Sequence, residues 1–233
     1  MGGHPEPIMT AFKLIISDSL HFFLSNLRQI AAVSLPFLLL GAAVNNLVFS
    51  SPEATQEAAR FLPVIVNLAL KPVYTAALIL MMARQAYQER PSTPELLRSA
   101  LGHYAPLLML SVIEMALVWT GFMALIVPGV WILVRLSFAK FHLILDRVDP
   151  KAAIFKSFQM TRGHFGIIVA SLAIFALPLF LLSLMLAQLI GDDQASPLAL
   201  MMVDTAILFA ALFIEVVMFR IFMQAVKERP AQK

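Results

Sequence analysis

Six long runs of apolar residues constrain this chain more than any other feature of its sequence. A helix needs roughly 20 apolar residues to cross the hydrocarbon core of a bilayer. Six stretches approach or exceed that length, and they occupy residues 29–50, 61–82, 105–127, 130–145, 166–190 and 198–222. The fourth is the shortest, and Pro128-Gly129 precedes it. The sequence therefore predicts an all-α membrane protein with six transmembrane helices in one domain.

The overall composition supports the same class. Hydrophobic residues make up 60% of the 233 residues and charged residues 13%, whereas a soluble domain has about 45–50% and about 25%. A chain of this length cannot bury so much apolar surface in a water-soluble core, so we expect much of it to face lipid. The net charge of +3 is explained by basic residues on the cytosolic side, and we expect no nucleic-acid partner.

Lys and Arg are distributed unevenly between the two sides that six spans would create. One side would hold the N-terminal segment 1–28, the segments 84–103 and 147–162, and the tail 223–233, which carry most of the basic residues. The other side would hold only Arg60 among acidic residues. Cytosolic loops of membrane proteins are enriched in Lys and Arg, so this pattern predicts that both termini are cytosolic.

A weak internal repeat precedes the apolar runs. The segments FKLIISDSLHFFLSNLRQI, ELLRSALGHYAPLL and AAIFKSFQMTRGHFGII each lead into a pair of spans. In the third segment, Lys151, Lys156 and Arg162 can lie opposite an apolar helix face. Amphipathic helices of this kind lie in the headgroup layer, where basic residues are attracted to anionic lipid. We therefore expect three hairpins, each preceded by a cytosolic interfacial helix, with these three residues in contact with anionic headgroups.

Charged residues within the apolar runs are the main candidates for a functional site. Counting about 1.5 Å per residue from the outer end of each span places Arg135 and Asp204 both roughly 10 Å deep. The same count places Lys71 at about 16 Å and Glu114 at about 21 Å, a difference that a lysine side chain can bridge. We therefore predict two ion pairs, Arg135–Asp204 and Lys71–Glu114.

A fifth charge, Glu215, lies nearer the cytosolic end of the last span, within reach of Lys140 or Arg220. A lone charge at the middle of a membrane costs about 2.5–3.5 kcal/mol on insertion scales, so such residues are functional candidates. Three interpretations stay open: the charges hold the hairpins together, they bind a lipid headgroup or a solute, or they carry protons or ions. An alternative interpretation of Arg135 is that its side chain extends toward the outer headgroups.

Motifs of known enzyme classes are missing from the sequence. It contains no GxxxxGK[ST] phosphate loop, GxSxG elbow or CxxC pair. The histidines have neither HxxxH nor HExxH spacing, and there is no cysteine, so we expect no metal site and no cofactor. We predict a non-enzymatic protein.

One segment resembles a known family. The sequence IVPGVWILVRLSFAKFHLILDRVDPKAAIFKSFQMTRGHFG resembles the signature of the YciC family of bacterial inner-membrane proteins. It is also similar to the membrane domain joined to some glycerophosphodiester phosphodiesterases. The matching positions are Pro128, Gly129, Arg135, Ala153, Ser157, Arg162 and Gly163. The resemblance implies a multi-pass protein of the bacterial inner membrane. No soluble phosphodiesterase domain is recognised, so we expect no such activity.

These observations lead to two functional hypotheses. The first is an envelope accessory protein that organises lipids or serves as a subunit beside a membrane-protein partner. The alternative is a transporter of small solutes or lipids that uses the charges within the spans.

Overall fold

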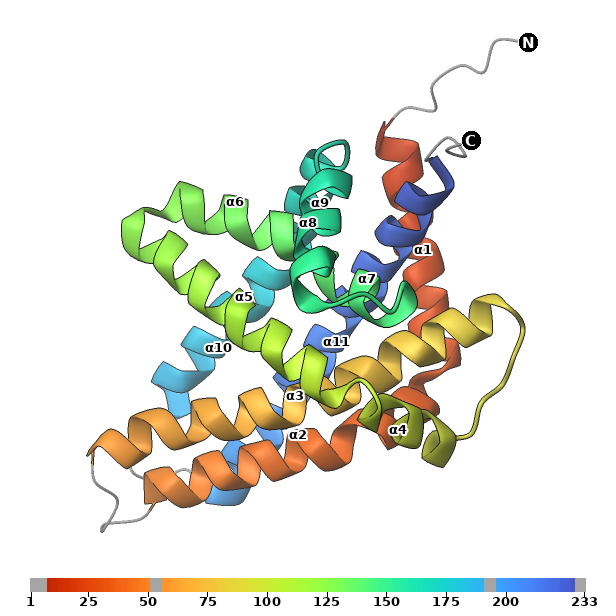
Figure 1. Cartoon of the computed structure of the whole chain (residues 1–233). Coiled ribbons are helices and arrows are strands. Elements are labelled where there is room, and N and C mark those ends of the chain that lie inside the picture. The colour runs from red at the N-terminus through yellow and green to blue at the C-terminus, as the bar shows by residue number, and fades with distance from the viewer. Residues whose placement is uncertain (1–7, 51–55, 191–195, 229–233) are drawn as a thin grey trace, which may run out of the picture.

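The structure is a computed structural model that describes residues 8–50, 56–190 and 196–228. In these residues all regular structure is helical (Figure 1). The elements are α1 (Ile8–Ser25), α2 (Leu27–Ser50), α3 (Gln56–Ala86), α4 (Thr93–Leu101), α5 (Tyr104–Ala124), α6 (Ile126–Leu136), α7 (Ala139–Leu145), α8 (Pro150–Met160), α9 (Phe165–Ser171), the π-helical η1 (Leu172–Ala176), α10 (Leu177–Ile190) and α11 (Pro197–Glu228).

The predicted number and order of spans is confirmed. Within the described residues, six helical segments are long and apolar enough to cross a membrane. They are Leu27–Val48, Phe61–Ala86, Tyr104–Ala124, Ile126–Leu145, Phe165–Leu186 and Leu198–Glu228. The chain is therefore an all-α protein with the helices of a multi-pass membrane protein.

The fourth and fifth spans are not continuous α-helices. The fourth consists of α6 and α7, which are separated by a turn at Ser137 and Phe138. The fifth contains η1 between α9 and α10. Pro178 follows η1 and has no N–H to donate to the carbonyl of Ile174, which accounts for a local departure from α-helical hydrogen bonding. Such π-helical insertions interrupt α-helices in short stretches.

Most of the close packing lies around α3, α7 and the second half of α11. Helix α7 is almost wholly buried, with Phe141 fully enclosed, and Phe138 just before it is equally inaccessible. The ring of Phe222 from α11 packs against both of these rings, with centroids 5.5 and 5.1 Å apart. Helix α2 lies along α3, and α5 lies along α6 (Figure 1). The first turn of α1 and the last turn of α11 lie on the same side of the molecule.

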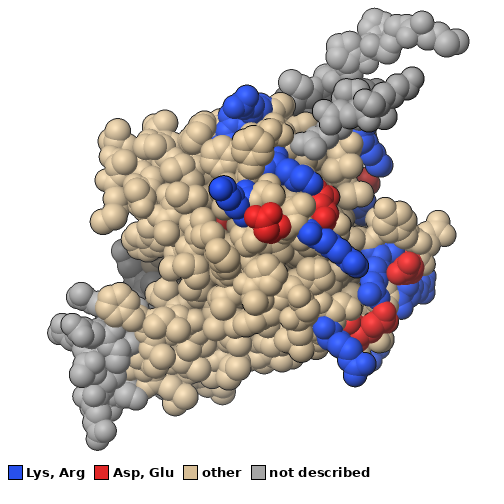
Figure 2. All heavy atoms as spheres, in the orientation of Figure 1, with Lys and Arg blue, Asp and Glu red and all other residues tan. Residues whose placement is uncertain are grey.

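Large apolar side chains are exposed away from this core. At the turn between α5 and α6, Met123, Leu125 and Val127 are 70–85% exposed. On the face shown in Figure 2, charged side chains gather toward the top and right, and the left part of the described surface is almost entirely uncharged. Exposed apolar surface of this extent marks a site of interaction with a membrane or another protein, as expected for helices that face lipid.

Two glycines allow α5 and α6 to approach closely. A Cβ atom at Gly121 would lie 2.9 Å from the Cα of Gly129, and a Cβ at Gly129 would lie 2.6 Å from the Phe122 ring. Small residues at helix contacts permit such packing in membranes. Gly129 therefore belongs to the α5–α6 contact.

Replacing Gly121 with Ala is expected to lower the free energy of unfolding by about 1–3 kcal/mol, because the methyl group would push the two backbones apart. Thermal unfolding in detergent measures the effect. Gly163→Ala is the matched control, since a Cβ there has no neighbour within 4 Å and should leave stability nearly unchanged. Equal unfolding temperatures for the two variants would contradict this account of the glycine contact.

Candidate functional site

Charged residues from four helices gather around two adjoining cavities. The larger cavity has a volume of about 660 Å³, and Lys71 of α3, Glu114 of α5 and Glu215 of α11 are among its lining residues. The smaller one, of about 20 Å³, is lined by Lys71, Glu114 and Lys140 of α7. We refer to Lys71, Glu114, Lys140 and Glu215 as the charge cluster. Two lysines and two glutamates give it no net formal charge.

Lys140 and Glu215 form an ion pair within the charge cluster. Their side chains are only 19% and 18% exposed. Lys140 was one of the two partners suggested for Glu215 by the sequence. The other, Arg220, instead places its guanidinium carbon 5.4 Å from the centroid of the Phe22 ring, at the opposite face of α11.

The predicted direct ion pair between Lys71 and Glu114 is wrong. Both residues line both cavities, but they form no salt bridge with each other. Lys140 reaches the same region from the buried helix α7, and both lysines interact electrostatically with both glutamates. The four charges therefore form one network. The prediction from depth had instead paired Lys71 with Glu114 alone.

Uncharged polar groups extend the site along α3. The Asn67 amide donates to the Pro63 carbonyl at 2.8 Å and to Asn45 Oδ1 of α2 at 3.3 Å. Tyr74 and Ser111 also line the larger cavity. The sequence suggested Lys140 only as one of two partners for Glu215, and it did not single out Tyr74. The spacing of Tyr74 three residues after Lys71 puts them on the same helix face and was the available signal.

The predicted ion pair between Arg135 and Asp204 is also wrong. The Arg135 guanidinium donates to the Phe158 carbonyl at 3.2 Å and to Thr161 Oγ1 at 3.4 Å, at the C-terminal end of α8. Its Cζ atom lies 5.3 Å from the centroid of the Trp131 ring. Asp204 is exposed on α11. The carbonyl groups at a helix C-terminus favour a cation, so the end of α8 provides acceptors for Nη1 of Arg135 without a carboxylate, while its Nε is buried without a hydrogen-bond partner.

Ser157 connects the bend of the fourth span to α8. Its hydroxyl donates to the Arg135 carbonyl at 2.6 Å and accepts from the Phe138 N–H at 3.2 Å. These are the two sides of the turn between α6 and α7. Ala153 is buried one turn earlier on the same face of α8. Arg135, Ala153 and Ser157 thus hold α8 against this turn.

The other side of α8 is partly apolar and partly basic. Lys151, Phe155 and Arg162 are exposed and line a shallow surface groove of about 720 Å³. Gly163 follows them and is also exposed. This arrangement differs from the predicted one, because Phe155 shares the exposed side with the basic residues.

Lys156 lies at the edge of α8 and donates to Asp146 at 2.7 Å. Partial burial raises the pKa of Asp146, but hydrogen bonds from Lys156 and His142 outweigh it and hold that pKa below its ordinary value. Lys156 is therefore engaged in an ion pair, whereas it was predicted to contact lipid.

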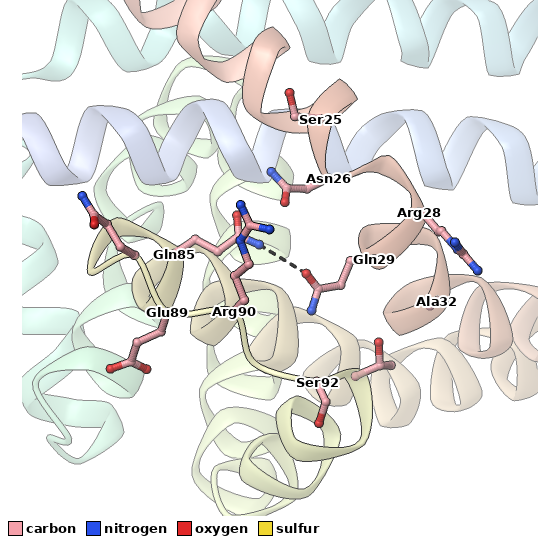
Figure 3. Close-up of a pocket in the computed structure, with 11 residues that line it drawn as sticks. Ser25, Asn26, Arg28, Gln29, Ala32, Gln85, Glu89, Arg90 and Ser92 are labelled. Carbon is pink, nitrogen blue, oxygen red and sulfur yellow. Dashed lines mark hydrogen bonds between the residues drawn. The ribbon is translucent and has the colours of Figure 1, made fainter.

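A second, polar groove lies where the end of α1 and the start of α2 meet the α3–α4 connection (Figure 3). Its volume is about 940 Å³. Gln85 Nε2 donates to Gln29 Oε1 at 3.2 Å, and Gln29 Nε2 donates to the Pro91 carbonyl at 2.7 Å. Arg28 and Arg90 both line the groove, and Figure 3 shows the Arg90 side chain near the hydrogen bond between Gln85 and Gln29. No sequence signal singled out this groove.

Among the described residues, no three His, Asp or Glu side chains lie together in a way that could hold a metal ion. The arrangement of the charge cluster can bind charged groups. No protein-family model, curated protein or solved structure matches this chain.

Proposed function

We propose that this chain is a non-enzymatic, lipid-organising protein of the bacterial inner membrane, which binds a lipid or a small polar solute at the charge cluster. The observation that carries the proposal is the cavity of about 660 Å³, which is lined by Lys71, Glu114 and Glu215 together with a majority of apolar residues. Binding sites for small molecules are typically concave and apolar, with a few convergent polar groups.

The depth of the charge cluster supports a binding role. Glu114 lies ten residues from each end of α5, which corresponds to about 15 Å from either end. Lys71 lies ten residues inside the span Phe61–Ala86. Both charges are therefore near the middle of the proposed bilayer, where ionisable residues are costly and mark pathways or binding sites.

The proposed topology has three hairpins with both termini in the cytosol. It is supported by the contacts of α2 with α3, α5 with α6 and α10 with α11, and by the excess of Lys and Arg in the segments predicted to be cytosolic. Helices α1, α4 and α8 precede the three pairs. The exposed side of α8, with Lys151, Phe155 and Arg162, suits contact with anionic headgroups. The resemblance to the YciC family is consistent with this topology and with the inner membrane.

A cavity-filling variant tests the proposal. Ala211 lines the larger cavity, so Ala211→Trp is expected to exclude a bound lipid or solute. Native mass spectrometry after extraction in a mild detergent should show a ligand in fixed stoichiometry on the wild type and at least tenfold less on this variant. Ala210→Trp is the matched control, because Ala210 is exposed and does not line the cavity. Equal ligand retention by both variants, or none by the wild type, would contradict the proposal.

Transport is the second candidate, and the direct accessibility of Lys71 favours it. Lys71 is exposed although it lies near the middle of a span, and a charge reachable from the cavity can bind and release a substrate. Counterflow into vesicles that contain the purified protein distinguishes the two functions. A lipid-organising protein retains its ligand without transport, whereas a transporter exchanges it and loses exchange in Ala211→Trp.

A further inference from the structure

We propose that the larger cavity binds a zwitterionic group, with an anionic oxygen of phosphate or carboxylate at Lys71 and an ammonium group at Glu114. This inference rests on the proposed binding function and adds the chemical class of the ligand. Its basis is the unequal pairing within the charge cluster.

Only one cation and one anion of the cluster are paired with each other. Lys140 and Glu215 form an ion pair. Among the described residues, the Lys71 ammonium and the Glu114 carboxylate make no direct ion pair or hydrogen bond, although both line the same cavities. Charged groups at low dielectric require a partner or a solvating group. The cavity thus presents one cation and one anion for which a ligand can supply the partners.

Charge balance favours a zwitterion over ligands of a single sign. A purely anionic group at Lys71 would bring a negative charge close to Glu114 and repel that carboxylate, whose electrostatic interaction with Lys140 would be opposed by it. A purely cationic group at Glu114 would likewise repel Lys71. A ligand that carries both charges satisfies both residues and keeps the site neutral. The site therefore selects a zwitterion over ligands of a single sign by repelling the latter as well as by attracting the former.

The remaining walls suit the uncharged parts of such a ligand. Asn67, Tyr74 and Ser111 offer polar atoms near the two charges, whereas Val118 and Leu208 line the apolar part. Trp119, which is 66% exposed, also borders the cavity. An ammonium-bearing phospholipid headgroup and a free zwitterionic solute present the same chemistry, and the experiment separates these two sources.

Competition between lipids tests the ligand class. Purified protein in detergent is offered phosphatidylethanolamine and phosphatidylglycerol in equal amounts, and retained lipid is quantified by native mass spectrometry. The wild type is expected to prefer phosphatidylethanolamine about tenfold, which corresponds to about 1.4 kcal/mol. Glu114→Gln should remove the preference, because an amide keeps the shape but not the charge. Lys71→Gln should weaken the retention of both lipids.

A control variant and a test for a free solute as the ligand complete the experiment. Asp204→Asn removes another carboxylate from the spans, but Asp204 is exposed and does not line the cavity, so its preference should equal that of the wild type. In a parallel arm, thermal unfolding is followed with glycine or phosphoethanolamine. Stabilisation by either solute that is lost in Glu114→Gln, without lipid preference, would support the zwitterion and identify a solute as its source.

Two outcomes overturn the inference in different ways. Retention of phosphatidylglycerol as strong as that of phosphatidylethanolamine, with no stabilisation by the solutes and with displacement by Ala211→Trp, would reject the zwitterion and leave the proposed binding function intact. No retained lipid and no stabilisation by solute would reject both. If a charge variant fails to fold, the preference of the wild-type protein for phosphatidylethanolamine over phosphatidylglycerol decides between these outcomes.

Discussion

Replacing Lys140 with Met is expected to lower the free energy of unfolding by about 3–5 kcal/mol, because it leaves the Glu215 carboxylate buried without its partner. The side chains of both residues are less than one-fifth exposed, and α7 lies within the best-packed part of the fold. Glu215→Leu should cost a similar amount for the same reason. Equilibrium unfolding in mixed micelles measures both changes.

The double variant Lys140→Met, Glu215→Leu should recover most of that stability, since no uncompensated charge remains. Lys156→Met is the matched control, because its ion pair with Asp146 is 39% and 37% exposed and exposed pairs contribute about 0–1 kcal/mol. If the double variant were as unstable as the sum of the two single variants, the pair would not be the source of the effect.

Arg135→Ala is expected to cost about 2–4 kcal/mol, because it removes hydrogen bonds from a charged donor and the contact with the Trp131 ring. The loss should also leave the Phe158 carbonyl without its guanidinium donor. Arg135→Lys should have an intermediate effect, since lysine keeps the charge but not the planar arrangement of donors. Thermal unfolding in detergent compares the three proteins.

Asp204→Asn is the decisive comparison for Arg135. The structure gives these residues no shared contact, so this change should alter stability by less than about 0.5 kcal/mol, as exposed substitutions usually do. The double variant should equal the sum of the single changes. A large loss in Asp204→Asn that does not add to the loss in Arg135→Ala would restore the ion pair that the sequence predicted.

The sequence by itself determined the number and order of the spans, and it narrowed the partner of Glu215 to Lys140 or Arg220. Hydropathy over about 20 residues is a local property, and it reports the burial of a helix in lipid whatever its neighbours are. The run 105–127 therefore matches the span Tyr104–Ala124, and the run 61–82 lies within Phe61–Ala86. Lys140 and Arg220 were both named for Glu215 because it lies near the predicted cytosolic end of its span, and the structure pairs it with Lys140.

Only the tertiary structure decided which other charges meet. The depth argument treated each span as a straight helix. In the fourth span, however, α6 ends at Leu136 and the chain turns before α7, and the C-terminus of α8 lies beside Arg135. Depth also carries no information about rotation around the helix axis, so it paired Lys71 with Glu114 and missed the entry of Lys140 from α7. Pairing depends on bends, rotations and neighbours, and these follow from packing across the whole chain.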